Sequence, residues 1–158
     1  MDQPTSPDRG SRESFDARLL APLLARAPSF RNVPASEIEA ITPGFRARAI
    51  AVGEVVVHQG DDGDEMFLVE EGDLEATVEL QGRRVRLGLL RPGDVFGEMT
   101  LLRGTPRSAT VTALRPARLW SLTRATLRAA TTLTPVLEAN LREVMRRRDL
   151  ANALRALQ

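Results

Sequence analysis

The feature that most constrains the fold is a series of short apolar segments separated by glycine-containing turns. From Phe45 onward, runs rich in Val and Leu recur, including AIAVGEVVVHQG, EMFLVEEGDLEATVEL and RRVRLGLLRPGDVFG. Branched side chains pack well on a pleated surface, so these runs indicate β-strands. Turns such as GDDGD at residues 60–64 separate them about every 8 to 12 residues, which favours a small antiparallel barrel or jelly roll over a parallel sheet.

The segment before the strands predicts a tail and two helices. Residues 1–14 are rich in Pro, Ser, Gly and charge, and we expect them to be disordered. From Phe15 the apolar residues follow helical spacing, and Pro28 ends this helix. Ser36 and Glu39 match a capping box, which predicts that a second short helix opens at Ser36.

Helical spacing returns after the strands, first over residues 124–131 and then from Pro135, which suits the first turn of a helix. The final helix carries an apolar stripe made of Val136, Leu137, Leu141, Val144, Met145, Leu150, Leu154 and Leu157. This stripe either packs within the chain or forms a surface for a partner or a second copy. The expected order is helices, antiparallel β-structure and helices, in the single domain that 158 residues allow.

Composition excludes several classes of function. The chain contains no cysteine, which excludes disulfides, thiolate catalysis and cysteine-ligated metal. His58 is the only histidine, so histidine-based metal clusters and Ser/His/Asp triads lack a component. We therefore expect no enzyme activity and no metal cofactor, a structural role for His58, and a place in the core for Trp120.

Charge and apolar content limit the partners. No stretch resembles a secretory signal or reaches 18 consecutive apolar residues, which predicts a cytoplasmic protein without a membrane segment. The net charge of +1 excludes a strong uniform attraction to nucleic acid. Residues 53–79 contain ten acidic residues and no arginine, whereas residues 115–158 contain nine arginines and three acidic residues. Either these are solvated turns and helix faces, or the final helix presents a basic surface to an acidic partner or a nucleotide.

The stretch FGEMTLLRGTPRSATV, residues 96–111, has the properties of an anion site. Gly97 allows a sharp turn, after which EMTLL can form a short helix whose first N–H groups lack partners within the helix. Such groups favour phosphate by geometry and by dipole. Arg107, preceded by Pro106, can bring a planar two-pronged donor to the same anion, and Ser108 adds a hydroxyl.

Glu98 indicates what else the ligand carries. A carboxylate accepts hydrogen bonds, so Glu98 suits a sugar hydroxyl that lies next to the phosphate. A ligand with a phosphate, an adjacent ribose hydroxyl and a flat apolar base would satisfy Glu98, Arg107, Ser108 and the Val/Leu walls together. A cyclic nucleotide is such a ligand.

Two motifs carry a resemblance to a known family. FGEMTLLRGTPRSATV is similar to the phosphate-binding cassette of cyclic nucleotide-binding domains, whose pattern is Phe-Gly-Glu, a short helix, and then Arg-Ser/Thr/Ala-Ala. The upstream GDDGDEMFLVEEGDLE resembles the Gly-x-x-Gly-Asp turn and Met-Phe/Tyr strand of the same family. The motifs occur in the family's order, and the resemblance covers roughly residues 28–150.

The resemblance implies an α+β fold, in which an antiparallel, jelly-roll-like β-roll is flanked by N-terminal helices and by a C-terminal hinge and lid helix. The implied divisions are the disordered tail over residues 1–14, the β-roll with its N-terminal helical segment over residues 15–134, and the lid helix over residues 135–158.

The resemblance also assigns the site residues. Arg107 and Ser108 would bind the cyclic phosphate, and Glu98 would bind the ribose 2′-hydroxyl. Backbone amides would come from Gly97, Glu98 and Met99. The expected contacts of the base are Val78, Leu87 and Leu89, with Arg148 of the last helix covering it.

The function implied is a receptor that converts cyclic nucleotide binding into movement of its last helix and signals through a protein effector. Ser108 favours cyclic AMP over cyclic GMP, because a threonine at this position in relatives can also bond the guanine amino group. About ten residues remain after Arg148 of the lid helix, too few for a helix-turn-helix, so direct DNA binding is not expected. Two alternatives are the regulatory end of an ion channel and a partner-binding adaptor with a degenerate nucleotide pocket.

Overall fold

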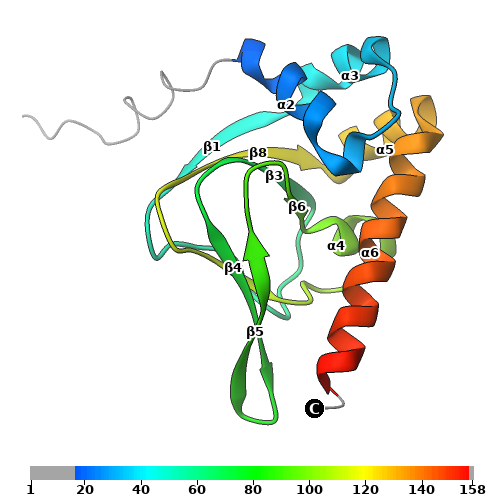
Figure 1. The fold of residues 1–158 in the computed structure, drawn as a ribbon. Helices are drawn as coiled ribbons and strands as arrows, with labels where there is room; N and C mark the ends of the chain where they lie inside the picture. Colours follow the sequence, from blue (N-terminus) through cyan, green and yellow to red (C-terminus); the bar gives the residue numbers. More distant parts are fainter. Residues whose placement is uncertain (1–16, 157–158) are drawn as a thin grey trace, which may run out of the picture.

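The computed structural model describes residues 17–156, and the predicted tail, Phe15 and Leu157 lie outside this range. The described chain forms an antiparallel β-roll with helices at both ends of the sequence (Figure 1). The predicted α+β class and the antiparallel roll are confirmed. Among the described helices, none has the length and apolar content needed to cross a membrane.

The roll consists of two four-stranded sheets, each with strands that are distant in sequence. The first sheet has the order β1 (Arg46–Ile50), β8 (Ala117–Thr123), β3 (Glu65–Glu71) and β6 (Val95–Phe96). The second has the order β2 (Val55–Val57), β7 (Thr110–Ala113), β4 (Leu74–Leu80) and β5 (Arg83–Leu90). All of the strand pairs are antiparallel, so the glycine turns connect neighbouring or facing strands as the sequence predicts.

The central strands of the first sheet are buried on both faces. In β3, Met66 and Leu68 belong to the core that packs against the helices. Phe67 and Val69 point to the other side and pack against the second sheet. Side chains alternate across a strand, so burial on both faces explains why β3 reads as the continuous apolar run MFLV. Trp120 of β8 lies in the helix-facing core, as predicted.

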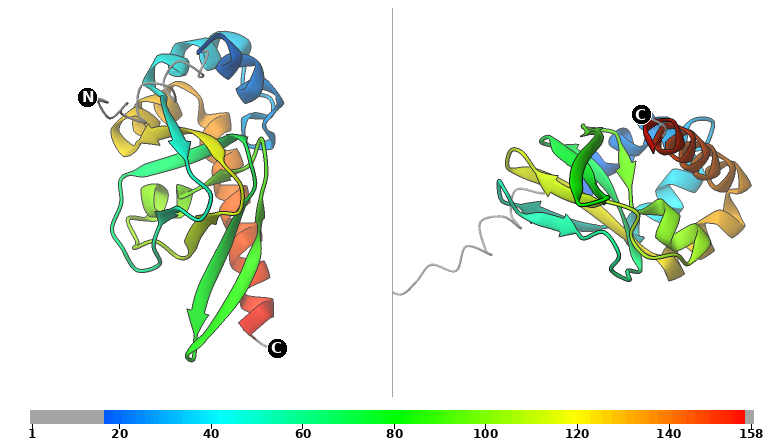
Figure 2. Two further views of the ribbon diagram at one scale, coloured as in Figure 1. Left: turned by 90° about the vertical axis from the view of Figure 1, so that its left-hand side faces the viewer. Right: turned by 90° about the horizontal axis from the view of Figure 1, so that it is seen from below.

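Most of the helices pack against the first sheet, and the second half of α6 extends past it beside the β4–β5 hairpin (Figures 1 and 2). The N-terminal group contains η1 (Ala17–Leu19), α2 (Leu20–Arg26), η2 (Pro28–Phe30), α3 (Ala35–Ile41) and η3 (Thr42–Gly44). The later helices are α4 (Glu98–Arg103), α5 (Arg124–Leu133) and α6 (Pro135–Ala156). α4 follows β6 directly, and α6 runs past α4 along the side of the roll.

The predicted capping box at Ser36 is wrong. The N-cap residue of α3 is Pro34, and no side chain bonds to the start of this helix. The carbonyl of Pro34 accepts hydrogen bonds from the N–H groups of Glu37 and Ile38, which places Ser36 inside the first turn. The fixed φ of Pro34 defines the helix boundary, whereas the spacing of Ser36 and Glu39 does not.

The apolar stripe of α6 has two different environments. Leu137, Leu141 and Met145 are buried against the rest of the chain. Leu150 and Leu154 are 63% and 55% exposed, because the second half of α6 extends beyond the helical core and runs beside the β4–β5 hairpin (Figures 1 and 2). Of the two alternatives, packing within the chain therefore applies to the first half of the stripe, and a partner surface stays a prediction for the second half.

Two glycine turns provide a test of the roll's closure. Gly72, between β3 and β4, has a φ of 104°, and an added Cβ would lie 2.7 Å from Cα and Cβ of Ala117. Gly82, at the tip of the β4–β5 hairpin, has a φ of 76° and no heavy atom within 4 Å of an added Cβ. Both positions disfavour a side chain, but only Gly72 also lacks space.

We expect Gly72→Ala to lower the free energy of unfolding by roughly 2 to 5 kcal/mol, the sum of the positive-φ cost and a packing clash. Gly82→Ala should cost only about 1 to 2 kcal/mol, because the backbone cost acts alone. Urea denaturation of both variants measures the difference. Equal losses would contradict close packing of the β3–β4 turn against Ala117.

Candidate functional site

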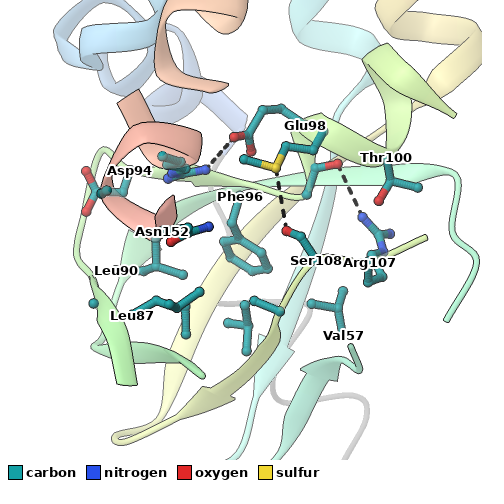
Figure 3. A pocket seen from close by; sticks show the side chains of 18 of the residues that line it. Val57, Leu87, Leu90, Asp94, Phe96, Glu98, Thr100, Arg107, Ser108 and Asn152 are labelled. Carbon is teal, nitrogen blue, oxygen red and sulfur yellow. Dashed lines mark hydrogen bonds and ion pairs between the residues drawn. The ribbon is translucent and has the colours of Figure 1, made fainter. Parts of the chain in front are cut away.

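A cavity of about 330 Å³ lies where the second sheet, α4 and α6 meet (Figure 3). Its apolar wall is formed by Val57, Ala76, Leu87, Leu89, Leu90, Phe96 and Val111. Its polar side contains Gly97, Glu98, Arg107 and Ser108, and α6 contributes Arg148, Ala151 and Asn152. The cavity therefore combines a flat apolar wall with a cluster of charged groups, as ligand-binding cavities commonly do.

The polar side is built around the start of α4. Gly97 adopts a left-handed φ of 83°, which turns the chain from β6 into α4. Gly97 is also the N-cap residue and has no side chain that could bond the first N–H groups of the helix. Ser108 lies across from this turn, with its Oγ 3.5 Å from Sδ of Met99.

Arg107 is a buried cation enclosed by backbone. Its side chain is 7% exposed, and Nη1 donates a hydrogen bond to the carbonyl of Gly97 at 3.3 Å. A Cβ added to Gly63 would fall on the guanidinium, and one added to Gly97 would lie 2.7 Å from Nη1. The backbone of Arg107 is bonded to the 60–64 loop in both directions, from its N–H to Asp61 and from the N–H of Gly60 to its carbonyl.

The electrostatic surroundings of Arg107 do not neutralise it. Burial lowers the pKa of Arg107, although the carboxylates of Glu65 and Asp64 oppose this shift. Within residues 17–156, no carboxylate lies close enough to form an ion pair with Arg107. A buried charge without a partner is costly, so this position favours binding of an anion.

Glu98 is buried more deeply and does have a cationic partner. It is 1% exposed, and its Oε1 accepts a hydrogen bond of 2.6 Å from Nη1 of Arg148 on α6 (Figure 3). Nη2 of Arg148 also donates to the carbonyl of Val95. The second oxygen, Oε2, has no hydrogen-bond partner among the described residues. Glu98 therefore holds α6 with one oxygen and leaves the other for a hydroxyl donor.

A second ion pair joins α4 and α6 at the surface. Arg103, the last residue of α4, approaches Asp149 with 2.6 Å between Nη2 and Oδ2. The charges are reversed relative to Glu98 and Arg148, since here the cation lies on α4 and the acid on α6. These two contacts fix α6 beside both ends of α4.

Comparison with known proteins identifies this arrangement. The family model described as "Cyclic nucleotide-binding domain" matches residues 47–132, which is more than half of the chain. The chain belongs to the cyclic nucleotide-binding domain family. The matched region includes the 60–64 loop, α4 and the Arg-Ser pair, and it contains all of the cavity lining except the residues of α6.

Relatives of this cyclic nucleotide-binding domain occur in several kinds of protein. A putative potassium channel protein of Rhodopseudomonas palustris is 37% identical over 132 residues, which cover 82% of this chain and 31% of that protein. The regulatory domain of Toxoplasma gondii PKA, solved with cAMP, is 28% identical with a TM-score of 0.68, over 72% of this chain and 44% of that one.

A further similar structure is the Catabolite Activator Protein of Thermus thermophilus, which is 30% identical with a TM-score of 0.74. This similarity covers 82% of the present chain and 62% of the other. The cyclic nucleotide-binding domain described here thus spans less than two thirds of each of these three proteins.

The cavity brings together eight of the nine residues that the sequence assigned to the site: Gly97, Glu98, Met99, Arg107, Ser108, Leu87, Leu89 and Arg148. Arg148 was expected to cover the base of the ligand. In the structure it lines the cavity and its guanidinium is bonded to Glu98.

Val78 lies elsewhere, in a separate hollow on the second sheet. Ala76 pairs with Gly88 and Thr77 with Arg86, so Leu87 is an extra residue in β5. Val78 comes after this bulge along β4, in the part of the hairpin that lies beyond the cavity.

Sequence reasoning missed Asn152 and the inner strand residues of the cavity. Asn152 lies four residues after Arg148, on the same face of α6, so helical spacing could have indicated it. Val57 and Val111 come from β2 and β7, which pair across a long separation in sequence. No local pattern predicts that these two strands line one cavity.

The pairing of Glu98 with Arg148 can be tested without a ligand. We expect Arg148→Met to lower the free energy of unfolding by about 1 to 3 kcal/mol, because it leaves a buried carboxylate without its cation. Adding Glu98→Gln to Arg148→Met should recover part of this loss, since an amide does not need a charged partner. Chemical denaturation of both variants, with the exposed Arg147→Met as a control, measures the effect. Wild-type stability in Arg148→Met would contradict the pairing.

Proposed function

We propose that this domain is a receptor for a cyclic nucleotide, with cyclic AMP as its preferred ligand, and that binding changes the position of α6. The observation that carries the proposal is the buried guanidinium of Arg107, which faces a cavity of ligand size and has no ion-pair partner in the described chain. A cyclic phosphate supplies the missing negative charge. The cavity volume of about 330 Å³ lies in the range of small-molecule sites.

In the proposed complex each part of the ligand meets a matching group. Arg107 and Ser108 bond the cyclic phosphate, together with backbone amides of Gly97, Glu98 and Met99. The ribose 2′-hydroxyl donates to Oε2 of Glu98, the oxygen that has no partner. The base lies against the apolar wall that includes Leu87 and Leu89.

The contacts of α6 provide the route from binding to movement. Arg148 is held by Glu98, the same residue that would receive the ribose hydroxyl. Binding therefore changes the surroundings of the residue that holds α6 to α4. A shift from 1:99 to 99:1 between two positions of α6 requires about 5.5 kcal/mol of differential binding. Two or three charge-assisted hydrogen bonds of about 1.5 to 3 kcal/mol each, made in only one position, are sufficient.

The output of the receptor is proposed to be a protein effector, with the roll over residues 15–134 as the receiver and residues 135–158 as the lid. The arginines on the exposed face of α6 are paired within the helix, with Arg142 bonded to Glu138 and both Arg146 and Arg147 bonded to Glu143. This pairing supports a solvated helix face, and it does not support direct DNA binding. We propose a cytoplasmic, non-enzymatic role.

The potassium channel relative supports a second output. Its similarity covers 82% of this chain, including the region of α4 and the Arg-Ser pair. In that case the same receiver would regulate an ion channel, and α6 would transmit its movement to the channel's pore-forming part. Both outputs use the same ligand site and differ only in what α6 contacts.

Titration with cyclic AMP, followed by NMR of the α6 amides, tests the proposal. We expect saturable binding and changes in the chemical shifts of the α6 amides. Arg107→Ala should weaken the binding free energy by about 2 to 5 kcal/mol, the range for removing one member of a buried charge pair. Arg147→Ala removes an exposed arginine and should bind like wild type. Failure of the wild-type protein to bind either cyclic nucleotide at millimolar concentration would support the adaptor with a degenerate pocket. Unchanged affinity in Arg107→Ala would refute the role of this residue.

The base preference has its own test. We expect the wild-type protein to bind cyclic AMP more tightly than cyclic GMP. Ser108→Thr should reduce the difference between the two binding free energies by about 1 kcal/mol, the typical net value of one added hydrogen bond. Calorimetric titrations of the wild-type protein and of Ser108→Thr with each nucleotide give the ratio of the two affinities in each protein. A wild-type preference for cyclic GMP would overturn this assignment while leaving the receptor role intact.

A further inference from the structure

Arg124 occupies a junction behind the cavity that the motifs do not include. It is the first residue of α5 and directly follows β8. Its Nη2 donates to the carbonyl of Thr100 in α4 at 3.1 Å and to the carbonyl of Gly63 at 3.5 Å, the long end of the hydrogen-bond range. Its backbone N–H donates to the carbonyl of Asp64 at 2.8 Å. One residue thus connects α4, the 60–64 loop and the start of α5.

The two segments that Arg124 connects are those that enclose Arg107. The backbone of Gly63 lies against the guanidinium of Arg107 so closely that a Cβ would overlap it. Thr100 belongs to α4 and lines the cavity next to Gly97, whose carbonyl accepts the hydrogen bond from Arg107. A change in the separation of Gly63 and α4 would therefore move the guanidinium of Arg107. Arg124 itself is not among the residues that line the cavity.

The charges at this junction also indicate an anionic ligand. The positive charge of Arg124 is close enough to contribute to lowering the pKa of Arg107, after the larger effect of burial. Within the described residues, Arg124 has no carboxylate at ion-pair distance, and neither does Arg107. The carboxylates of Glu65 and Asp64 offset the repulsion between the two guanidinium groups without pairing with either of them, so an anion bound at Arg107 would supply a direct partner.

We propose that Arg124 is a positioning residue for the anion site. It holds Gly63 and α4 at the separation that directs Arg107 into the cavity, and it connects this arrangement to α5, the helix that leads into the lid. This inference rests on the proposed cyclic nucleotide receptor. It adds a residue that acts through Arg107 and does not touch the ligand.

A double-mutant cycle with cyclic AMP tests this role. Binding is measured by NMR titration, which covers weak affinities, for wild type, Arg124→Gln, Arg107→Ala and the double variant. We expect Arg124→Gln to weaken binding about tenfold, equivalent to about 1.4 kcal/mol. In the Arg107→Ala background the same substitution should change affinity by less than about twofold, since a residue that acts through Arg107 has nothing left to position.

Arg128→Gln provides the matched control, because it removes an exposed arginine one turn later in the same helix. It should bind like wild type. Thermal unfolding without ligand identifies any loss of the fold in Arg124→Gln, and Arg124→Lys then takes its place in the same cycle. Lysine keeps the charge but lacks the planar guanidinium whose Nη2 reaches both carbonyls, so we expect a clear loss of affinity from it as well.

The outcomes separate the two proposals. If the wild-type protein binds neither cyclic AMP nor cyclic GMP, the receptor function fails. If the wild-type protein binds but Arg124→Gln stays within about twofold of it, the positioning role fails alone. Independent effects that multiply in the double variant would also overturn the role, because they would show that Arg124 acts without Arg107.

Discussion

The site is organised around a cation that the protein buries without neutralising. The guanidinium of Arg107 is enclosed by the backbones of Gly63 and Gly97, and no acidic side chain of the described residues pairs with it. Glycine is required at these two places because any side chain would occupy the space of the guanidinium. A buried cation of this kind reduces the stability of the empty site and favours an anionic ligand. The 60–64 loop and α4 enclose this group, and Arg124 bonds both of these segments.

Glu98, the acid of the site, has an ion-pair partner, whereas Arg107 has none among the described residues. The partner of Glu98 lies on α6, so this ion pair connects the site to the lid helix. Glu98 is buried even more deeply than Arg107, but Arg148 of α6 supplies its counter-charge. The cavity therefore contains a cation that lacks an ion-pair partner and a carboxylate that is bonded to α6. In the proposed receptor, a ligand with an anionic part and a hydroxyl would contact both groups at once. Glu98 would then link binding to movement of α6, with no need for a longer chain of contacts.

The first sheet and α6 differ in how fully the rest of the fold buries them. β3 and β8 are buried on both faces, so the sheet that carries the 60–64 loop and leads into α5 has a fixed position. α6 is buried only over its first half, and Leu150 and Leu154 beyond it are exposed. The β4–β5 hairpin, which carries a bulge at Leu87, extends out of the roll beside this second half of α6. The cavity thus lies between the second sheet and a helix that is exposed at its far end.

Local sequence patterns were sufficient to predict the antiparallel strands, their glycine turns, the order of helices and roll, and the importance of the FGEMTLLRGTPRSATV segment, because each depends on neighbours within a few positions. The local pattern predicted the wrong start for α3, since Pro34 overrides the spacing of Ser36 and Glu39. The three-dimensional arrangement was needed to show that Val78 lies outside the cavity, that Arg148 bonds Glu98, that Asn152 lines the cavity and that Arg124 bonds α4. These features depend on contacts between segments tens of residues apart. Packing of the whole chain brings such segments together, and no local spacing encodes it.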